Sequence, residues 1–448
     1  MTKLRFAPSP TGYLHLGNIR TALITWLFAR AHKGSFILRL DDTDHQRSQQ
    51  KYADQILEDL HWLGLDHDEV MRQSDRLIQY AQAAETLKMK GRLYPCYETP
   101  EELELMRKIQ LSAGKPPLYT RAALSLTPAQ IAKYQKEGRI PHWRFKMNAH
   151  EIRWHDLVRG EVVFRGEVLS DPILIRAEGS PVFTLATSVD DLEMGITHIL
   201  RGEDHVTNTA VQIQIMEALG DGKPTRIQFG HLSLIAGRGG EGLSKREGSL
   251  GICQLRAEGL EPLAITSLLS KLGTSDPILP YTTLKGILAA FDIGKFSRAT
   301  PKLDPDDLTQ MNIKILQAFD FNQIKARLEA MELVGVTPDF WTLIQKNITT
   351  FHDVKEWWEI CYGHKAFLEE NKNLMEVAEH FLPFTPWHED TFKEWMDAIR
   401  DETGLKGKEL YHPIRRALTG REQGPELKDL ILIMGRAKVV NRLQTARE

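Results

Sequence analysis

The chain has 448 residues, a formal net charge of −3, 42% hydrophobic residues and 26% charged residues. A chain of this length is too long for one hydrophobic core, so we expect two to four domains. Its composition is that of an ordinary globular protein, and it contains no apolar run of about 18 residues that would cross a membrane.

The small net charge means that a nucleic-acid partner would have to bind a local basic patch. The first residues lead directly into an apolar segment without a signal-peptide pattern, so we expect a cytoplasmic protein with no membrane partner. Cys96, Cys253 and Cys361 lie far apart in the sequence and are expected to be reduced thiols.

The N-terminal segment predicts a strand, a turn and a helix. Residues 4–7 form a short apolar run, two prolines and a glycine follow, and residues 19–32 show apolar side chains at helical spacing. A helix that begins after such a turn directs free backbone N–H groups and the positive end of its dipole at the loop. The segment is therefore a candidate site for the phosphates of a nucleotide.

His15 and Asn18 flank Gly17 at the predicted helix entrance. Both side chains carry donors for phosphate oxygens, and a glycine between them would let a flat ring approach the backbone. The alternative is a proline-rich turn with one satisfied surface histidine, because a single histidine is not specific evidence of a site.

Residues 35–40 predict a second strand, followed by the acidic cluster Asp41-Asp42-Thr43-Asp44. A helix is expected to begin near His45, and Asp44 is interpreted as its N-terminal cap. From about Gly91 the alternation of strands and helices stops. A helix at 101–111 and short strands at 143–146 and 162–164 predict an insertion into the nucleotide-binding fold.

The parallel fold is predicted to resume at 171–176 and to continue through 182–186 and 197–200, forming a doubly wound sheet with its ligand at the carboxyl ends of the strands. Arg201 follows such a strand end. Taken alone, it could be a solvated arginine paired with Glu203.

Gly237 and Gly242 have the spacing of a P-loop, but Leu243 and Ser244 follow where that motif requires lysine and then serine or threonine. We therefore reject a P-loop. Beyond residue 250 the pattern is almost wholly helical, with helices expected at 260–272, 310–319, 340–345, 354–361 and 390–399. Residues 401–448 hold ten lysines and arginines against seven acidic residues, a small local excess that favours some phosphate contacts.

Two strings taken together resemble a known family. Pro8-Ser9-Pro10-Thr11-Gly12-Tyr13-Leu14-His15-Leu16-Gly17-Asn18 is similar to the first signature of class I aminoacyl-tRNA synthetases in its glutamyl form. Gly242-Leu243-Ser244-Lys245-Arg246 is similar to the second signature, a loop over the ATP phosphates. Residues 407–422 resemble the helical C-terminal domain of the same family, so the resemblance to bacterial-type glutamyl-tRNA synthetases covers nearly the whole chain.

The resemblance implies an α/β doubly wound (Rossmann-type) catalytic domain, split by an α+β insertion and followed by an all-α C-terminal half. It implies five parts: 1–85 and 173–240 for the two catalytic halves, 86–172 for the acceptor-stem-binding insertion, 241–315 for a stem-contact domain and 316–448 for an anticodon-binding domain.

The resemblance also assigns residues. Catalytic roles are implied for His15, Asn18 and Lys245. ATP would be bound by Pro8, Ser9, Gly17, Asn18, Ser244, Lys245 and Arg246. Glutamate would be bound by Arg5, Ala7, Ser9, Asp41, Phe183, Thr187 and Arg201, with Asp41 at the α-amino group and Arg201 at the side-chain carboxylate.

Four departures from the family pattern stand out. Asp41 replaces a common glutamate, Phe183 and Thr187 replace a common tyrosine and asparagine, and Gly242 replaces the first lysine of the second signature. Many relatives also hold zinc in the insertion through closely spaced cysteines. Cys96 has no cysteine near it in the sequence, so we predict no structural zinc.

The implied activity is the ATP- and Mg²⁺-dependent attachment of L-glutamate to tRNA-Glu by a monomeric ligase. Charging of tRNA-Gln as well, and a non-catalytic tRNA-binding paralogue, remain alternatives. A glutaminyl-tRNA synthetase would end in β-barrels, and a shorter relative that modifies a tRNA base lacks the C-terminal domain. Neither fits a 448-residue chain with a helical end.

Overall fold

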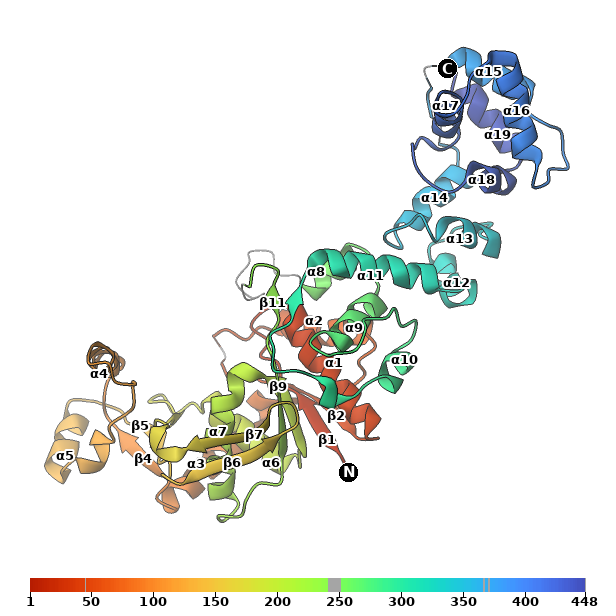
Figure 1. The fold of residues 1–448 in the computed structure, drawn as a ribbon. Coiled ribbons are helices and arrows are strands. Elements are labelled where there is room, and N and C mark those ends of the chain that lie inside the picture. The colour runs from red at the N-terminus through yellow and green to blue at the C-terminus, as the bar shows by residue number, and fades with distance from the viewer. Residues whose placement is uncertain (45, 241–250, 366, 370, 448) are drawn as a thin grey trace. The chain divides into compact units, whose positions relative to one another are not determined.

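The computed structural model describes residues 1–448 except 45, 241–250, 366, 370 and 448, and Figure 1 labels its elements. The chain forms two compact units. The first contains residues Met1–Leu255, Thr266–Leu279 and Thr283–Asp304, and the second contains Arg256–Ile265, Pro280–Thr282 and Pro305–Glu448. The finer division into five parts stays a prediction.

Parallel strands form the centre of the first unit. Strands β1 (Lys3–Phe6), β2 (Ser35–Leu40) and β3 (Glu69–Arg72) pair in that order, and β9 (His198–Gly202) pairs with β10 (Gln228–Leu232). β1 also lies beside β9, because the amide of Thr197 donates to the carbonyl of Lys3 at 2.9 Å. The chain winds outward from this point in both directions, so the topological switch of the sheet lies between β1 and β9. In open parallel sheets, that is where ligands bind.

Five main helices cover these strands: α1 (Leu16–Ala31), α2 (Gln50–Trp62), α3 (Leu77–Met89), α6 (Phe183–Glu193) and α7 (Val206–Leu219). α1 begins three residues before the predicted start. It packs on β1, β2 and β9 and also against α10 (Leu284–Ala289), so its buried residues run almost around the helix instead of along one face.

The segment that the sequence predicts to be an insertion contains the helices α4 (Pro100–Ser112) and α5 (Pro128–Lys136). Strands β4 (Leu93–Cys96), β5 (His142–Phe145) and β8 (Ile173–Ile175) form an antiparallel sheet. β6 (Glu151–Asp156) and β7 (Gly160–Arg165) form a hairpin, and β6 also pairs in parallel with β10. The hairpin therefore extends the sheet of β9 and β10.

Three local predictions are wrong. Residues 173–175 belong to the antiparallel sheet of the insertion, so the parallel fold does not resume there. α2 begins at Gln50 with Gln49 as its cap residue, and Asp44 instead accepts the amide of Arg47 and pairs with its side chain. The segment 182–186 enters helix α6, which places Phe183 and Thr187 on a helix.

The remaining described elements before residue 305 are short. They are the strands β11 (Ala236–Gly237) and β12 (Lys302–Leu303) and the helices α8 (Ile252–Ala257) and α9 (Pro262–Lys271). There are also 3₁₀ turns at Gln73–Arg76, Ala122–Ser125, Gly166–Val168, Glu203–His205 and Ile293–Lys295. None of the helices among the described residues is both long and apolar enough to cross a membrane.

The second unit is helical, as predicted. Its helices are α11 (Pro305–Ala318), α12 (Phe321–Ala330), α13 (Pro338–Ile344), α14 (Asp353–Cys361), α15 (Lys372–His380), α16 (Thr391–Thr403), α17 (Lys408–Thr419), α18 (Leu427–Met434) and α19 (Arg436–Thr445). They share one core in which Trp341, Trp357 and Trp395 are the largest fully buried side chains.

Candidate active site

A cavity of about 600 Å³ lies at the switch point of the sheet, and many of the predicted site residues meet there. The predicted residues that line it are Arg5, Ala7, Pro8, Ser9, His15, Gly17, Asn18, Phe183 and Arg201. Asp41 and Thr187 are not among the described residues of its wall. Ser244, Lys245 and Arg246 lie outside the described residues.

His15 and Asn18 form the N-terminal cap of α1 and bond to each other's backbone. The His15 Nδ1 accepts the amide of Gly17 at 3.1 Å, and the Asn18 Oδ1 accepts the amide of His15 at 3.2 Å. Because Nδ1 is an acceptor, the neutral ring carries its proton on Nε2, and the Asn18 amide likewise has its NH₂ group left to donate. Burial lowers the pKa of His15, which favours this neutral form.

Gly17 is needed for this cap. A Cβ atom at residue 17 would lie 2.9 Å from His15 Cε1 and 3.0 Å from Nδ1, too close for the ring to stay in place. The sequence predicted that Gly17 would admit a flat ring, and the ring that lies against it in the structure is the His15 imidazole.

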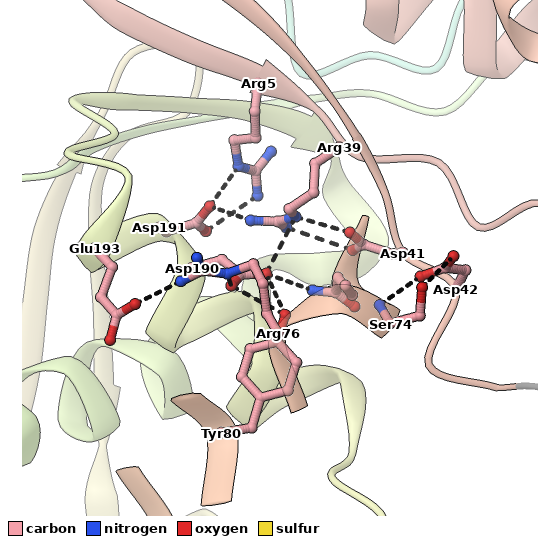
Figure 2. Close-up of polar contacts among 11 residues, drawn as sticks. Arg5, Arg39, Asp41, Asp42, Ser74, Arg76, Tyr80, Asp190, Asp191 and Glu193 are labelled. Carbon is pink, nitrogen blue, oxygen red and sulfur yellow. Dashed lines mark hydrogen bonds and ion pairs between the residues drawn. The ribbon is translucent and has the colours of Figure 1, made fainter. Parts of the chain in front are cut away.

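Arg5 is held by a buried network of charges, shown in Figure 2. It donates from Nε and Nη2 to the Asp191 carboxylate at 2.9 and 3.3 Å. Arg39, fully buried, lies between Asp191 and Asp41: its Nη1 donates to Asp191 at 2.8 Å and its Nε to Asp41 at 2.8 Å. Arg39 therefore connects Asp41, which is expected at the α-amino group of the substrate, with Asp191, the partner of Arg5.

A second layer holds Asp190. Arg76 and the hydroxyl of Tyr80 donate to its carboxylate at 2.7 to 3.0 Å, as does the Gln73 amide at 2.9 Å. Buried charges are costly unless they are paired and hydrogen-bonded, and here each carboxylate has several partners.

The carboxyl groups at the two ends of Arg39 differ in their acidity. Burial raises the pKa of Asp41 to about 6, an effect that outweighs the attraction of Arg39. Burial also disfavours the charge of Asp191, but Arg5 and Arg39 together hold its pKa below the usual range. Asp191 is therefore a fixed anion, whereas Asp41 is the easier of the two to protonate.

Arg201 lies at the end of β9 and is 6% exposed. Its Nη2 donates to Thr209 and Gln212, both at 2.6 Å, and its Nη1 has no hydrogen-bond partner among the described residues. Burial, followed by repulsion from Arg5, lowers the pKa of Arg201 to about 9. The guanidinium is a buried cation with one unpartnered nitrogen among the described residues, and Arg201 is one of the residues that line the cavity.

The interpretation of Arg201 as a solvated partner of Glu203 is wrong. Glu203 pairs instead with Arg159 at 2.7 Å and accepts the amide of Leu234.

Phe183 and Thr187, two of the four residues that depart from the family pattern, differ in their position relative to the cavity. Phe183 lines the cavity, and its ring centroid is 5.8 Å from that of His205. Thr187 is fully buried one helical turn further along α6, and its hydroxyl has no partner among the described residues.

Several residues of the site carry no sequence signal of their own. Arg39 and Asp191 resemble the ordinary charged ends of a strand and a helix, and Arg20 stands in an apolar helix. Arg20 lines the cavity and donates to the carbonyls of Ser233 and Leu272 at 2.5 and 3.1 Å. One signal in the sequence could have found Arg20 and Arg39: each is a charged residue in a strongly apolar segment, and such a residue is rarely buried unless it has a partner.

In the insertion, Cys96, Glu98 and His142 place one possible metal-ligand atom each within 4.8 Å of one another. The hydroxyl of Tyr119 already donates to Glu98 at 2.6 Å and lies 3.5 Å from the Cys96 sulfur. Burial raises the pKa of the Cys96 thiol to about 11, which favours the protonated form over the thiolate that binds metals.

The second unit has its own cavity, of about 1,000 Å³, beside α14 and the end of α17. Its walls combine the aromatic side chains of Trp358, Tyr362 and Phe367 with the cations of Lys355, Lys365 and Arg421. Aromatic faces and cations are the groups on which unpaired nucleic-acid bases stack and phosphates bind.

The chain matches two family descriptions. Residues 1–310 match "tRNA synthetases class I (E and Q), catalytic domain", and residues 305–447 match "Anticodon binding domain".

Whole-length relatives agree with these matches. The chain is 49% identical over 439 residues to a glutamate–tRNA ligase of Azospirillum brasilense, covering 98% of both chains. It is 47% identical to glutamate–tRNA ligase 1 of Maricaulis maris, covering 99% of both. A solved glutamate tRNA ligase of Elizabethkingia meningosepticum, in complex with its amino acid, superposes with a TM-score of 0.84 at 28% identity over 99% of both chains.

Proposed function

Because the chain belongs to the class I glutamate–tRNA ligase family, we propose that it attaches L-glutamate to the 3′ end of tRNA-Glu in two steps. The α-carboxylate of glutamate attacks the α-phosphorus of ATP and expels pyrophosphate, giving glutamyl-adenylate. A ribose hydroxyl of the terminal adenosine of the tRNA then takes the glutamyl group and releases AMP.

One observation carries this proposal. The phosphate donors at the start of α1 and the buried guanidinium of Arg201 line the same cavity, at the switch point of a parallel sheet. No protein nucleophile is needed, because the carboxylate of the substrate attacks. The protein has to hold the two substrates in line and to stabilise the charge of the transition state.

The phosphates would lie at the N-terminus of α1. The His15 Nε2–H and the Asn18 NH₂ group remain to donate, because their other polar atoms form the cap. Pro8, Ser9 and Gly17 line the approach. Lys245, with Ser244 and Arg246, would add cations from the second signature.

Mg²⁺ fits as an ion carried by the triphosphate. Asp204 is the one carboxylate among the described residues of the cavity wall, too few for a site held by protein ligands alone. When bound, Mg²⁺ would neutralise part of the phosphate charge.

The amino acid would lie between Arg5 and Arg201, beside Ala7, Ser9 and Phe183. Arg201 lines this space, and its Nη1, which has no hydrogen-bond partner among the described residues, would meet the side-chain carboxylate. Asp41 has a shorter side chain than the glutamate common in relatives, and its carboxylate is already held by Arg39. Because Asp41 is not among the described residues that line the cavity, it would act on the substrate ammonium through its charge and not through direct contact. Thr187 would act through packing.

ATP–pyrophosphate exchange tests the proposal. Glutamate with tRNA-Glu is expected to support exchange, and glutamine is not. Parallel reactions with tRNA-Gln decide whether the enzyme also charges that tRNA. No exchange with any pair of substrates would favour the non-catalytic tRNA-binding paralogue.

Arg201→Gln tests how the amino acid is chosen. An amide substrate would leave the buried guanidinium unpaired, which costs several kcal/mol and implies a preference for glutamate of about a thousandfold or more. The variant is expected to raise the KM for glutamate steeply and to narrow its preference over glutamine, with little change in the KM for ATP. An unchanged ratio of kcat/KM for the two amino acids would mean that Arg201 does not contact the side chain.

A further inference from the structure

Arg201 is the last member of a buried chain of hydrogen bonds that crosses four elements. Asp156 ends β6, His231 lies in β10, Thr209 and Gln212 lie one turn apart in α7, and Arg201 lies in β9. All five side chains are at most 6% exposed. His231 Nδ1 lies 2.5 Å from the Asp156 Oδ2, and its Nε2 lies 2.8 Å from the Thr209 hydroxyl.

The direction of each hydrogen bond follows from Asp156. Its Oδ1 accepts the backbone amides of Val158, Arg159 and His231 at 3.0 to 3.1 Å, and its Oδ2 faces His231 Nδ1. Burial alone would raise the pKa of Asp156, but the bonds from His231 and the amides hold it at about 2, so it is an anion. His231 therefore carries its proton on Nδ1 and donates it to Asp156.

The remaining positions are then fixed. Burial lowers the pKa of His231, which keeps the ring neutral and its Nε2 an acceptor for the Thr209 hydroxyl proton. The carbonyl oxygen of His205 is a second acceptor for the single hydroxyl proton of Thr209, at 3.2 Å, but His231 Nε2 is nearer at 2.8 Å. With the proton directed at His231, the Thr209 oxygen presents lone pairs to Arg201, whose Nη2 it accepts at 2.6 Å. Gln212 accepts the other proton of Nη2 at 2.6 Å.

These hydrogen bonds determine which nitrogen of the Arg201 guanidinium has no partner among the described residues. Both protons of Nη2 are used, and Nε lies 3.4 Å from His231, whereas Nη1 is unpartnered among the described residues. We propose that Asp156, His231 and Thr209 are positioning residues that hold the guanidinium with Nη1 turned to the substrate side-chain carboxylate. This inference rests on the proposed contact between Arg201 and glutamate.

Thr209 offers the sharpest test, because valine has its shape without the hydroxyl. Thr209→Val is expected to raise the KM for glutamate by about 10- to 100-fold, the range for lost outer partners of a binding group. The KM for ATP and the kcat should change little. Thr209→Ser keeps the hydroxyl and is expected to stay within about threefold of the wild type. Thr25→Val is the matched control, since the hydroxyl of that buried threonine donates to the carbonyl of Thr21 in the preceding turn of α1.

Asp156→Asn tests the direction of the hydrogen bonds that link Asp156, His231 and Thr209. It keeps an oxygen for the three amides but places an NH₂ group against His231, which moves the imidazole proton to Nε2, as happens when a carboxylate that orients a histidine is replaced by its amide. An Nε2–H would point at Thr209 and Arg201. We expect the KM for glutamate to rise and the ¹⁵N spectrum of His231 to show the other tautomer. Asp171→Asn, a buried carboxylate of the insertion that bonds Tyr94 and Arg121, is the control.

The outcomes distinguish the proposed contact between Arg201 and glutamate from the proposed positioning roles of Asp156, His231 and Thr209. If Arg201→Gln leaves the KM for glutamate unchanged, the proposed contact of Arg201 fails and the positioning roles fail with it. If Arg201→Gln raises the KM but Thr209→Val matches Thr209→Ser, the positioning role of Thr209 is overturned. Should Thr209→Val not fold, Asp156→Asn decides: an Nε2–H tautomer of His231 with a wild-type KM for glutamate overturns the inference.

Discussion

His15 has two tasks at the start of α1, and one substitution separates them. Nδ1 caps the helix, and Nε2–H is left as a phosphate donor. Asparagine is a good N-cap but does not reach as far, so His15→Asn should preserve the helix and lose the donor. We expect a pyrophosphate exchange rate lower by about 10²–10³, with a melting temperature close to that of the wild type.

His15→Ala is the comparison for this test, because it removes both tasks. It should lose a similar amount of activity and also about 1 kcal/mol of stability. A His15→Asn variant with normal exchange would show that the Nε2 proton does not contribute to catalysis.

Asp156 also makes stability depend on pH. Its pKa in the folded protein, about 2, is below the ordinary value of 3.8. A carboxyl group of this kind stabilises the folded state above pH 4, and this contribution is lost as the pH falls from about 4 to 2. Its size is about 2 kcal/mol. Asp156→Asn should therefore melt earlier at pH 7, and the difference from the wild type should narrow below pH 4. A difference that stays constant between pH 7 and pH 3 would contradict this account.

At the scale of elements, the strands and helices with a regular pattern were predictable. β2 has the predicted bounds, and the helices near 340–345 and 354–361 agree within two residues. β8 was misassigned because a short buried apolar run looks the same in a parallel and an antiparallel sheet. The start of α2 was misplaced because Asp44 has the chemistry of a cap but bonds within its own turn.

The site residues that could be predicted from the sequence are those assigned by the resemblance to the family. Pro8, Ser9, His15, Gly17 and Asn18 of the first signature line the cavity, and Arg201 lies in its wall. Thr209, Gln212 and His231 were missed because each is an ordinary polar residue with no motif, and their shared feature is that all three side chains are buried. The pairing of β6 with β10, which brings Asp156 to His231, joins residues about 75 positions apart and has no local signal.

The small antiparallel sheet of the insertion leads to a prediction about metal. In the sequence Cys96 has no neighbouring cysteine, and the structure places Glu98 and His142 near it. Tyr119 bonds one oxygen of Glu98, whereas the other oxygen and the Nε2 of His142 have no hydrogen-bond partner among the described residues. Because the buried thiol of Cys96 is held protonated, we still expect no stoichiometric zinc. Elemental analysis of the purified protein checks this. One zinc per chain that disappears in both Cys96→Ala and His142→Ala would show that the three residues bind metal.

At the scale of the whole molecule, recognition of tRNA should be separable from adenylate chemistry. Lys365 lines the cavity of the second unit and is exposed, so Lys365→Ala should weaken tRNA binding several-fold. If it contacts one phosphate of a single-stranded loop, the slope of log affinity against log salt should become shallower by about 0.7. The KM values for ATP and glutamate should not change. Lys346→Ala, an exposed lysine outside that wall, is the control; an equal effect in both variants would exclude a specific contact.

The hydrogen bonds between β6 and β10 also determine how the first unit unfolds. The amide of Leu157 donates to the carbonyl of Phe229 at 2.8 Å, and the Asp156 side chain holds the amide of His231 in the next strand. The hairpin of the insertion therefore cannot open without releasing the edge of the central sheet. Amide protons of the hairpin and of β10 should exchange with deuterium as one cooperative group, whereas α4 and α5, which have no buried side chains, should exchange much earlier.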